Sequence, residues 1–392
     1  MTAYGIQITQ DSSLIRINNC TFNNSFDTTI NPKQVTYTGI QYDWCDDVLI
    51  TECQFDNLYG AVQVGAVVSQ YPATNSIIKN CTMSNVITFA ILCGNCINLL
   101  VENCTMTVGL LNGAPINYFE LIGLTNLQFV TQEFACQDII IRGCTLSALN
   151  AAPGFDNIAI FPSTNVIIED CILETNSVVN SDNYHPANIH LISGSSGIKI
   201  KNTIIRGVQE RGIFLDGIQV TPGTIDNVEI NGCLIDGATV SGISFISGTT
   251  SSIKNNQIVN NLGDGISLDD ASILSLSSPI PTYSTDNLVS NNFISSNNGN
   301  GITVGLTGNV NNMIETNTVE NNSDGIVISS PNNAVISNNA MNNTGVGIVN
   351  NATNSKFYNN IAGGNKGSSN YTGVPFTVTQ GAPAIAGGNI DS

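Results

Sequence analysis

The sequence predicts an all-β fold, a single-domain solenoid in which a parallel β-helix of about 13 coils occupies nearly the whole chain. Three observations predict it. A short motif recurs along the chain, apolar residues alternate over short segments as they do in β-strands, and the intervening segments are rich in glycine and asparagine. No segment carries the apolar period of an amphipathic helix.

The recurring motif contains a cysteine in most copies of the first half, as in "IIKNCTM" (77–83) and "LLVENCTM" (99–106), and an asparagine in the second half. Steps of roughly 20–40 residues between copies are typical of a solenoid repeat with loop insertions of varying length. The aligned positions are Cys20, Cys53, Cys81, Cys104, Cys144, Cys171, Thr203, Cys233, Asn256, Asn292, Asn317, Asn339 and Asn360.

Most repeats contain two predicted strands. The first precedes the aligned residue and alternates, as in "VLI" (48–50) and "IKI" (198–200). The second often starts with glycine, as in "GIFLDG" (212–217) and "GISLDD" (265–270). In a parallel β-helix each such strand hydrogen-bonds to its equivalents one coil before and one coil after, which explains why the pattern recurs.

The cysteines of the motif have two interpretations, metal or disulfide chemistry and plain packing. Equivalent positions on in-register parallel strands lie about 4.8 Å apart with parallel Cβ directions, a poor match to the torsion of a disulfide. The pair in "CGNC" (93–96) has no second pair to complete a zinc site, and the chain has only two histidines. We therefore expect no metal site, and mostly reduced cysteines that fill inward positions.

Composition excludes several classes of function. Acidic residues outnumber basic ones 29 to 11, for a formal net charge of −18, which argues against nucleic-acid binding and disfavours a polyanionic glycan unless a cation bridges the charges. No apolar run approaches the about 20 residues of a membrane span, so we expect no membrane insertion. The first 20 residues lack the charge and apolar core of a signal peptide.

Over about residues 5–365 the repeat pattern resembles the right-handed parallel β-helix of the pectate-lyase-like superfamily, with the short repeat unit of NosD-type proteins. The resemblance implies a right-handed β-helix over residues 1–365 and an irregular C-terminal cap over 366–392. It favours an extracellular, cell-surface or virion-surface location. Two functions follow: a non-catalytic surface or structural rod that contacts glycans or other proteins, or a polysaccharide hydrolase or lyase with an outward groove.

The motifs of the enzymes are mostly missing. Of the Asn-Thr-Asp, Asp-Asp, Gly-His-Gly and Arg-Ile-Lys motifs of the related glycosidases, the chain offers a match only for the aspartate pair, at Asp269 and Asp270. The related lyases need a calcium ion held by carboxylates and an Arg or Lys base, and bases are scarce here. We therefore favour the non-catalytic rod, with no cofactor, and with calcium only if the protein is a lyase.

The best candidate site comes from the predicted register of the second strand. His190, Phe214, Ser244 and Ser267 should form one outward row, and Asp216, Ile246 and Asp269 the next. Asp216 and Asp269 would be two coils apart, roughly 10 Å, near the upper end of the carboxylate spacing in inverting glycosidases. The alternative is that these residues form turns and a solvated face. The candidate catalytic residues are Asp216, Asp269, Asp270, His190 and Arg211, and the candidate ligand-binding residues are Tyr184, His185, Glu210 and Phe214.

The two ends of the solenoid give different expectations. An uncapped end exposes unpaired strand edges, and the first predicted strand (4–9) begins almost at Met1. We therefore expect an upstream segment or a second copy of the chain to cover the N-terminal end, the latter giving a homo-oligomer. Residues 371–392 lose the repeat and are expected to fold over the other end.

Overall fold

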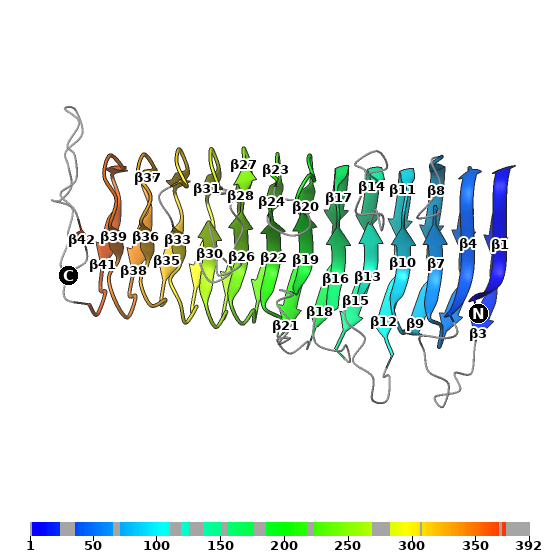
Figure 1. Ribbon diagram of the computed structural model, residues 1–392. Coiled ribbons are helices and arrows are strands. Elements are labelled where there is room, and N and C mark those ends of the chain that lie inside the picture. The colour runs from blue at the N-terminus through cyan, green and yellow to red at the C-terminus, as the bar shows by residue number, and fades with distance from the viewer. Residues whose placement is uncertain are drawn as a thin grey trace. The chain divides into compact units, whose positions relative to one another are not determined.

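The computed structural model describes residues 2–23, 36–65, 71–109, 119–124, 136–149, 155–175, 186–207, 209–217, 223–268, 283–305, 308–367 and 371–373. Within these ranges all secondary structure is β-strand or turn, and every strand pair given for them is parallel (Figure 1). None of the described residues forms a helix that could span a membrane. The all-β parallel coil predicted from the repeat is thus confirmed.

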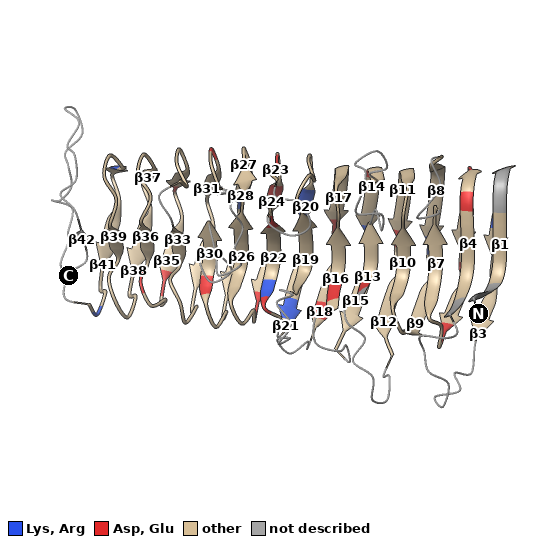
Figure 2. Ribbon diagram, viewed as in Figure 1, with Lys and Arg blue, Asp and Glu red and all other residues tan. Residues whose placement is uncertain are grey.

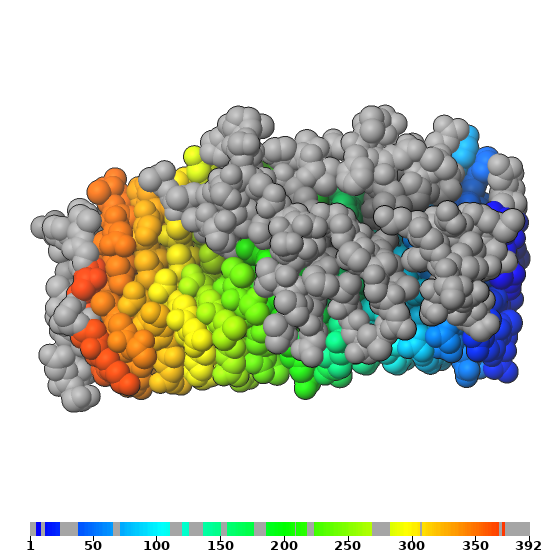
Figure 3. Space-filling view, turned by 60° about the horizontal axis from the view of Figure 1, so that its bottom comes forward, coloured from blue at the N-terminus to red at the C-terminus, as the bar shows by residue number. Residues whose placement is uncertain are grey.

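The chain divides into two compact units. Unit 1 comprises residues 1–191 and 195–199, and unit 2 comprises residues 192–194 and 200–392. Each unit is a stack of coils, and each coil contributes a strand to each of three faces, named face 1, face 2 and face 3. On Figure 3 the successive coils of unit 2 form neighbouring bands from green to orange.

In unit 1, face 1 consists of β1 (Thr2–Ser13), β4 (Thr36–Asp46), β7 (Gly60–Val64), β10 (Phe89–Cys93), β13 (Phe119–Leu124), β16 (Phe155–Ile160) and β19 (Ala187–Ile192), whose last residue belongs to unit 2. Face 2 consists of β2 (Arg16–Asn18), β5 (Leu49–Thr51), β8 (Ala73–Lys79), β11 (Cys96–Glu102), β14 (Cys136–Arg142) and β17 (Ser163–Glu169). Face 3 consists of β3 (Thr21–Asn23), β6 (Gln54–Asp56), β9 (Thr82–Val86), β12 (Thr105–Val108), β15 (Thr145–Ala148) and β18 (Ile172–Thr175).

In unit 2, face 1 consists of β22 (Arg211–Asp216), β26 (Ser241–Ile246), β30 (Asp264–Leu268), β33 (Ile302–Val304), β36 (Ile326–Ile328), β39 (Ile348–Asn350) and β42 (Tyr371–Gly373). Face 2 consists of β20 (Lys199–Lys201), whose first residue belongs to unit 1, then β24 (Glu229–Asn231), β28 (Ser252–Lys254), β31 (Leu288–Ser290), β34 (Met313–Glu315), β37 (Ala334–Ile336) and β40 (Lys356–Tyr358). Face 3 consists of β21 (Ile204–Gly207), β25 (Leu234–Asp236), β29 (Gln257–Val259), β32 (Phe293–Ser295), β35 (Thr318–Glu320), β38 (Asn339–Met341) and β41 (Ile361–Gly363). A short pair, β23 (Ile225–Asp226) and β27 (Gly248–Thr249), completes the unit.

Among the described residues, face 3 has six strands in unit 1 and seven in unit 2, one for each coil, which confirms the predicted count of about 13 coils. Residues 374–392, most of the segment expected as a C-terminal cap, lie outside the described residues. Before them, β42 (Tyr371–Gly373) still pairs with β39.

The core follows the alternation of the strands. In β11, Leu99 and Val101 are buried, while Leu100 between them is partly exposed. Face 1 departs from this pattern, because every residue of β16, β19, β22 and β26 is buried. The outward residues of these strands are therefore covered, whereas alternation alone would leave them in solvent.

The aligned residues of the motif lie inward at the bend between face 2 and face 3. All eleven cysteines are free, and ten of them are buried. In unit 1 each thiol of the ladder donates to the carbonyl two residues before it, as Cys81 does to Lys79 at 3.3 Å and Cys144 does to Arg142 at 3.4 Å. The cysteines thus act as small inward side chains that satisfy a backbone carbonyl, as the packing interpretation predicted.

In unit 2 the ladder continues through Thr203 and Cys233, and asparagines replace the cysteines from Asn256 on, with one correction to the predicted alignment. The ladder residue is Asn338, not Asn339. Asn338 is buried and bonds to Ile314 O and Asn360 Oδ1, whereas Asn339 begins β38 and is exposed. The turn residue Ser337 has a φ of 55°, and this left-handed turn directs the residue after it into the core.

Two further asparagine ladders flank this one and were not predicted. One contains Asn287, Asn312 and Asn333, and the other contains Asn261, Asn297, Asn322, Asn343 and Asn365. In each coil the ladder residues are five positions apart, and a left-handed residue precedes most of them. The stacked side-chain amides satisfy the backbone groups that the bends leave unpaired.

Candidate functional site

The structure describes five of the nine predicted site residues. Asp269, Asp270, Tyr184 and His185 lie outside the described residues. His190 belongs to β19 of unit 1, and Glu210, Arg211, Phe214 and Asp216 lie in or beside β22 of unit 2. In unit 2 the predicted rows agree with the observed register: Phe214 pairs with Ser244, Ser244 with Ser267, and Asp216 with Ile246.

The structure joins three of these residues around Arg211. Its Nη1 lies 2.8 Å from Glu210 Oε2, and its guanidinium carbon lies 4.5 Å from the centre of the Phe214 ring. All three side chains are buried, and Arg211 is only 1% exposed. A buried cation needs an anion and a polarisable neighbour, and Glu210 and Phe214 supply both, so this group has the chemistry of a stabilising ion pair.

In unit 1 His190 meets two acidic residues that were not among the candidates, Asp156 of β16 and Glu120 of β13. Its Nδ1 lies 3.2 Å from Asp156 Oδ2, while Asp156 Oδ1 accepts a hydrogen bond from the backbone N–H of Ala187 at 2.7 Å. His190 and Asp156 are fully buried, and Glu120 is partly exposed. We name Glu120, Asp156 and His190 the acid–histidine cluster.

The register of face 1 assembles the cluster. Glu120 pairs with Asp156, so their carboxyl groups leave neighbouring strands at the same level. Three residues further along β13, Gly123 pairs with Ala159, and Ala159 pairs with His190. Gly123 has no side chain, and the carboxyl group of Glu120 lies over it.

The environment of Glu120 changes its acidity. Burial of the carboxyl group, and to a smaller extent the charge of Asp156, raise the pKa of Glu120 from 4.5 to about 8, while His190 acts in the opposite direction. A carboxylic acid in such a place keeps its proton at neutral pH and can donate it. Perturbed acids beside a His–Asp pair are a recurrent mark of functional sites.

Sequence reasoning missed Glu120 and Asp156 because they lie in different coils, separated by loops of unequal length. A signal was present in "YFELIGL" (118–124) and "GFDNIAI" (154–160), where an acidic residue interrupts an otherwise apolar strand. Figure 2 shows acidic positions on β13 and β16 among mostly uncharged strands. Only the strand register, however, brings these acids to the histidine.

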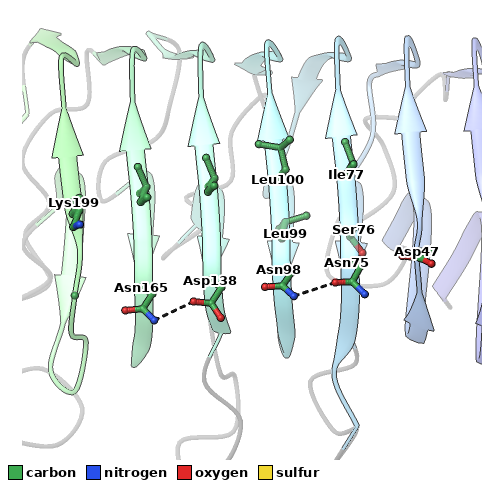
Figure 4. Close-up of a pocket in the computed structure, with 13 residues that line it drawn as sticks. Asp47, Asn75, Ser76, Ile77, Asn98, Leu99, Leu100, Asp138, Asn165 and Lys199 are labelled. Atoms are coloured by element: carbon green, nitrogen blue, oxygen red, sulfur yellow. Dashed lines mark hydrogen bonds between the residues drawn. The ribbon is translucent and has the colours of Figure 1, made fainter.

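A groove of about 580 Å³ runs along face 2 of unit 1 (Figure 4). Its floor is the outward apolar row of Ile77, Leu100, Ile140 and Ile167, each in register with the next. Its rim is the row of left-handed turn residues, Asp47, Asn75, Asn98, Asp138 and Asn165. Along the rim, Asn98 Nδ2 donates to Asn75 Oδ1 and Asn165 Nδ2 donates to Asp138 Oδ1, both at 3.0 Å.

The groove thus combines an apolar floor with amide and carboxylate groups at one edge. Lys199 lies among its lining residues. Throughout the part of the chain that the structure describes, no three His, Cys, Asp or Glu side chains gather in a way that could hold a metal ion.

Comparisons with known proteins bear on the fold. The family model for the right handed beta helix region matches residues 4–205, 132–280 and 216–382. The A-module of the mannuronan C-5 epimerase AlgE6 of Azotobacter vinelandii gives a TM-score of 0.52 at 12% identity, over 96% of this chain and 91% of that one. The periplasmic alginate epimerase AlgG gives 0.52 at 11% identity, over 87% and 77% of the two chains.

The tailspike protein of E. coli bacteriophage HK620, in complex with a pentasaccharide, gives a TM-score of 0.52 at 12% identity, over 87% of this chain and 65% of that one. No curated protein sequence matches the chain. At such identities the structural likeness establishes the fold and leaves the chemistry to the residues of this chain.

Proposed function

The chain belongs to the right-handed β-helix family, and from this premise we propose that it processes a polysaccharide, with Glu120 as the proton donor. The observation that carries the proposal is the raised pKa of Glu120, about 8, beside the Asp156–His190 pair. An acid whose pKa lies near the working pH is protonated when the substrate arrives and can still release its proton in the transition state.

The three residues of the cluster have different roles in this proposal. Glu120 is the partly exposed member, so it is the one that contacts the substrate. Asp156 and His190 are buried and act as positioning residues, since the charge of Asp156 favours the protonated form of Glu120. Proton donation of this kind to a glycosidic oxygen, or to a carbanion next to a carboxylate, needs no cofactor.

The substrate class is supported by the structural neighbours, which are described as an alginate epimerase, a mannuronan C-5 epimerase and a tailspike in complex with a pentasaccharide. The net charge of −18 favours a neutral polysaccharide, and a uronic polymer would need calcium to bridge the charges. An extracellular or surface location is part of the same proposal.

The test is a turnover screen on neutral and uronic polysaccharides, with and without calcium, that follows new reducing ends, unsaturated products and epimerised residues. Glu120→Gln should lose at least about a hundredfold in kcat, the usual scale of general-acid catalysis. Glu169→Gln, a partly exposed carboxylate on face 2 of the same unit, should keep full activity. Equal activity of Glu120→Gln and the wild type would contradict the proposal, and so would a complete absence of turnover.

The groove of face 2 favours a second candidate, a non-catalytic rod that binds glycans. Its amide rim could bond to hydroxyl groups while its apolar floor covers the carbon face of a sugar chain. In that case a polysaccharide would bind without turnover, and Leu100→Asp would abolish binding while Glu120→Gln would not. Calorimetric titration of both variants separates the two functions.

A further inference from the structure

We infer a second saccharide site on unit 1, a stacking platform formed by Trp44 and Tyr71 that takes a neutral sugar unit. Trp44 lies in β4, and Tyr71 lies just before β8, whereas Glu120 lies in β13. The site requires no chemistry from the acid–histidine cluster, so it holds whether or not the protein is an enzyme.

The two rings form a parallel stack at the surface. Their centres are 4.0 Å apart, and their planes differ by 5°. Tyr71 is 43% exposed and Trp44 is partly exposed, so the stack presents flat aromatic surface to solvent. A pyranose ring offers a matching apolar face of C–H groups, with its hydroxyl groups at the edge, and aromatic side chains bind such faces while polar neighbours bind the edge.

The backbone at Trp44 is unusual for so large a residue. Its φ is 52°, in the left-handed region that asparagine, aspartate and glycine occupy at most turns of this chain. Alternation along β4 turns Gln41 and Asp43 outward and Tyr42 inward, so Trp44 would be expected inside. The left-handed residue breaks the alternation, and Cys45 is again buried.

The neighbouring strand accommodates this change of direction. Thr9 of β1 pairs with Asp43, and Ser12 pairs with Cys45, so β1 places two residues opposite Trp44. This is a β-bulge, a feature that often redirects a side chain next to a functional site. A smaller left-handed residue would fit the coil with less strain, so the fold alone does not account for tryptophan here.

Polar groups that could bind sugar hydroxyls flank the platform. Asp43 accepts a hydrogen bond from the buried Gln41 Nε2 at 3.1 Å, and the partly exposed Gln63 of the next coil is in register with Gln41. On the other side of Trp44, Asp46 accepts hydrogen bonds from Asn75 Nδ2, at 2.9 Å, and from Thr74.

The negative charge near the platform favours neutral sugars over uronates. Asp43, Asp46 and Asp47 all lie within three residues of Trp44, and the chain carries a formal net charge of −18. A uronate would be repelled by these carboxylates, whereas a neutral hexose can donate hydroxyl hydrogens to them. We therefore assign the site to a neutral sugar unit.

Trp44 is the only tryptophan of the chain, so its fluorescence reports on the platform alone. The experiment titrates the full chain with neutral gluco- and manno-hexasaccharides and with an oligogalacturonate. A saturable change with a neutral sugar and none with the oligogalacturonate is the expected result. No change with any neutral sugar, or an equal change with the uronate, would overturn the assignment.

Three variants sharpen the test, with binding measured by calorimetry. Tyr71→Ala should weaken binding at least tenfold. Trp44→Asn should abolish binding and raise Tm, because asparagine adopts the left-handed conformation readily. If the stack is merely structural, Trp44→Asn instead lowers Tm, and the assignment falls. Glu120→Gln should leave the fluorescence titration of Trp44 unchanged, because this signal reports on the platform alone, so a failure of the proposed enzymatic function is distinguishable from a failure of this site.

Discussion

Glu120 lies directly over Gly123, three residues along the same strand. A Cβ atom on Gly123 would collide with Glu120 Oε1 and would lie 2.8 Å from its Cγ and 2.9 Å from its Cδ. The absent side chain of Gly123 is therefore what gives the Glu120 carboxyl group its place beside the Asp156–His190 pair. The Glu120 carboxyl group thus occupies the space that a side chain at position 123 would fill.

The first prediction follows from that contact. Gly123→Ala should displace the Glu120 carboxyl group toward solvent and lower its pKa, because the burial that raises the pKa is lost. The alkaline limit of activity should then move to lower pH, and kcat at neutral pH should fall. A pH–rate profile of the variant measures both.

A double mutant supplies the control. If the added methyl group acts only through the glutamate, Gly123→Ala should destabilise the wild type by about 1–3 kcal/mol and destabilise Glu120→Ala much less. Equal costs in the two backgrounds would show that the methyl group collides with something else.

The second prediction concerns stability against pH. The folded protein keeps the Glu120 proton up to about pH 8, whereas the unfolded chain releases it near 4.5. Because the folded state binds the extra proton between these values, the free energy of unfolding should fall as pH rises, by at most about 1.4 kcal/mol per pH unit. Below this window the free energy of unfolding should not depend on the group's titration, and above it the loss should be complete and constant with pH.

The measurement compares urea midpoints of the wild type and Glu120→Gln across this pH window. Glutamine does not ionise, so the difference between the two proteins should shift in favour of the variant as pH rises. A constant difference would mean that Glu120 titrates normally.

The third prediction tests the corrected ladder position. Asn338→Ala removes bonds to Ile314 O and Asn360 Oδ1 and leaves the backbone N–H of Asn317 without its Asn338 Oδ1 acceptor. Since buried groups left without partners cost about 1–3 kcal/mol each, we expect a loss of about 3 kcal/mol in the free energy of unfolding. Asn339→Ala, one residue later and exposed, should stay within about 0.5 kcal/mol. If denaturant titrations show that Asn339→Ala is more destabilising than Asn338→Ala, the ladder residue is Asn339 and the correction is wrong.

The fourth prediction concerns the thiols. Ten of the eleven cysteines are buried and Cys20 is partly exposed, so one thiol of the native protein should react quickly with a disulfide reagent. The others should react only on unfolding, because burial hinders access and raises the pKa of a thiol such as Cys233, to about 11. Several fast thiols in the native protein would show that the cysteine ladder is not packed as described.

The ladder residues show which inward positions a local sequence pattern can predict. The inward positions of the first eleven coils, from Cys20 to Asn317, could be aligned from sequence because each follows an alternating strand and a turn residue. Near Asn338 and Asn339 the pattern fails, since two asparagines follow Ser337 and either one fits the motif. The flanking ladders were missed for the same reason, because asparagine is also frequent at the turns themselves.

The sequence by itself determined the repeat, the number of coils and the inward row, because alternation and turn chemistry are local properties of the chain. Only the tertiary structure decided which polar residues meet. Glu120, Asp156 and His190 lie in three coils joined by loops of unequal length, so their contact depends on strand register, which no single coil encodes. Trp44 faces outward for a similar reason, since one left-handed residue opposite a bulge reverses the direction that alternation predicts.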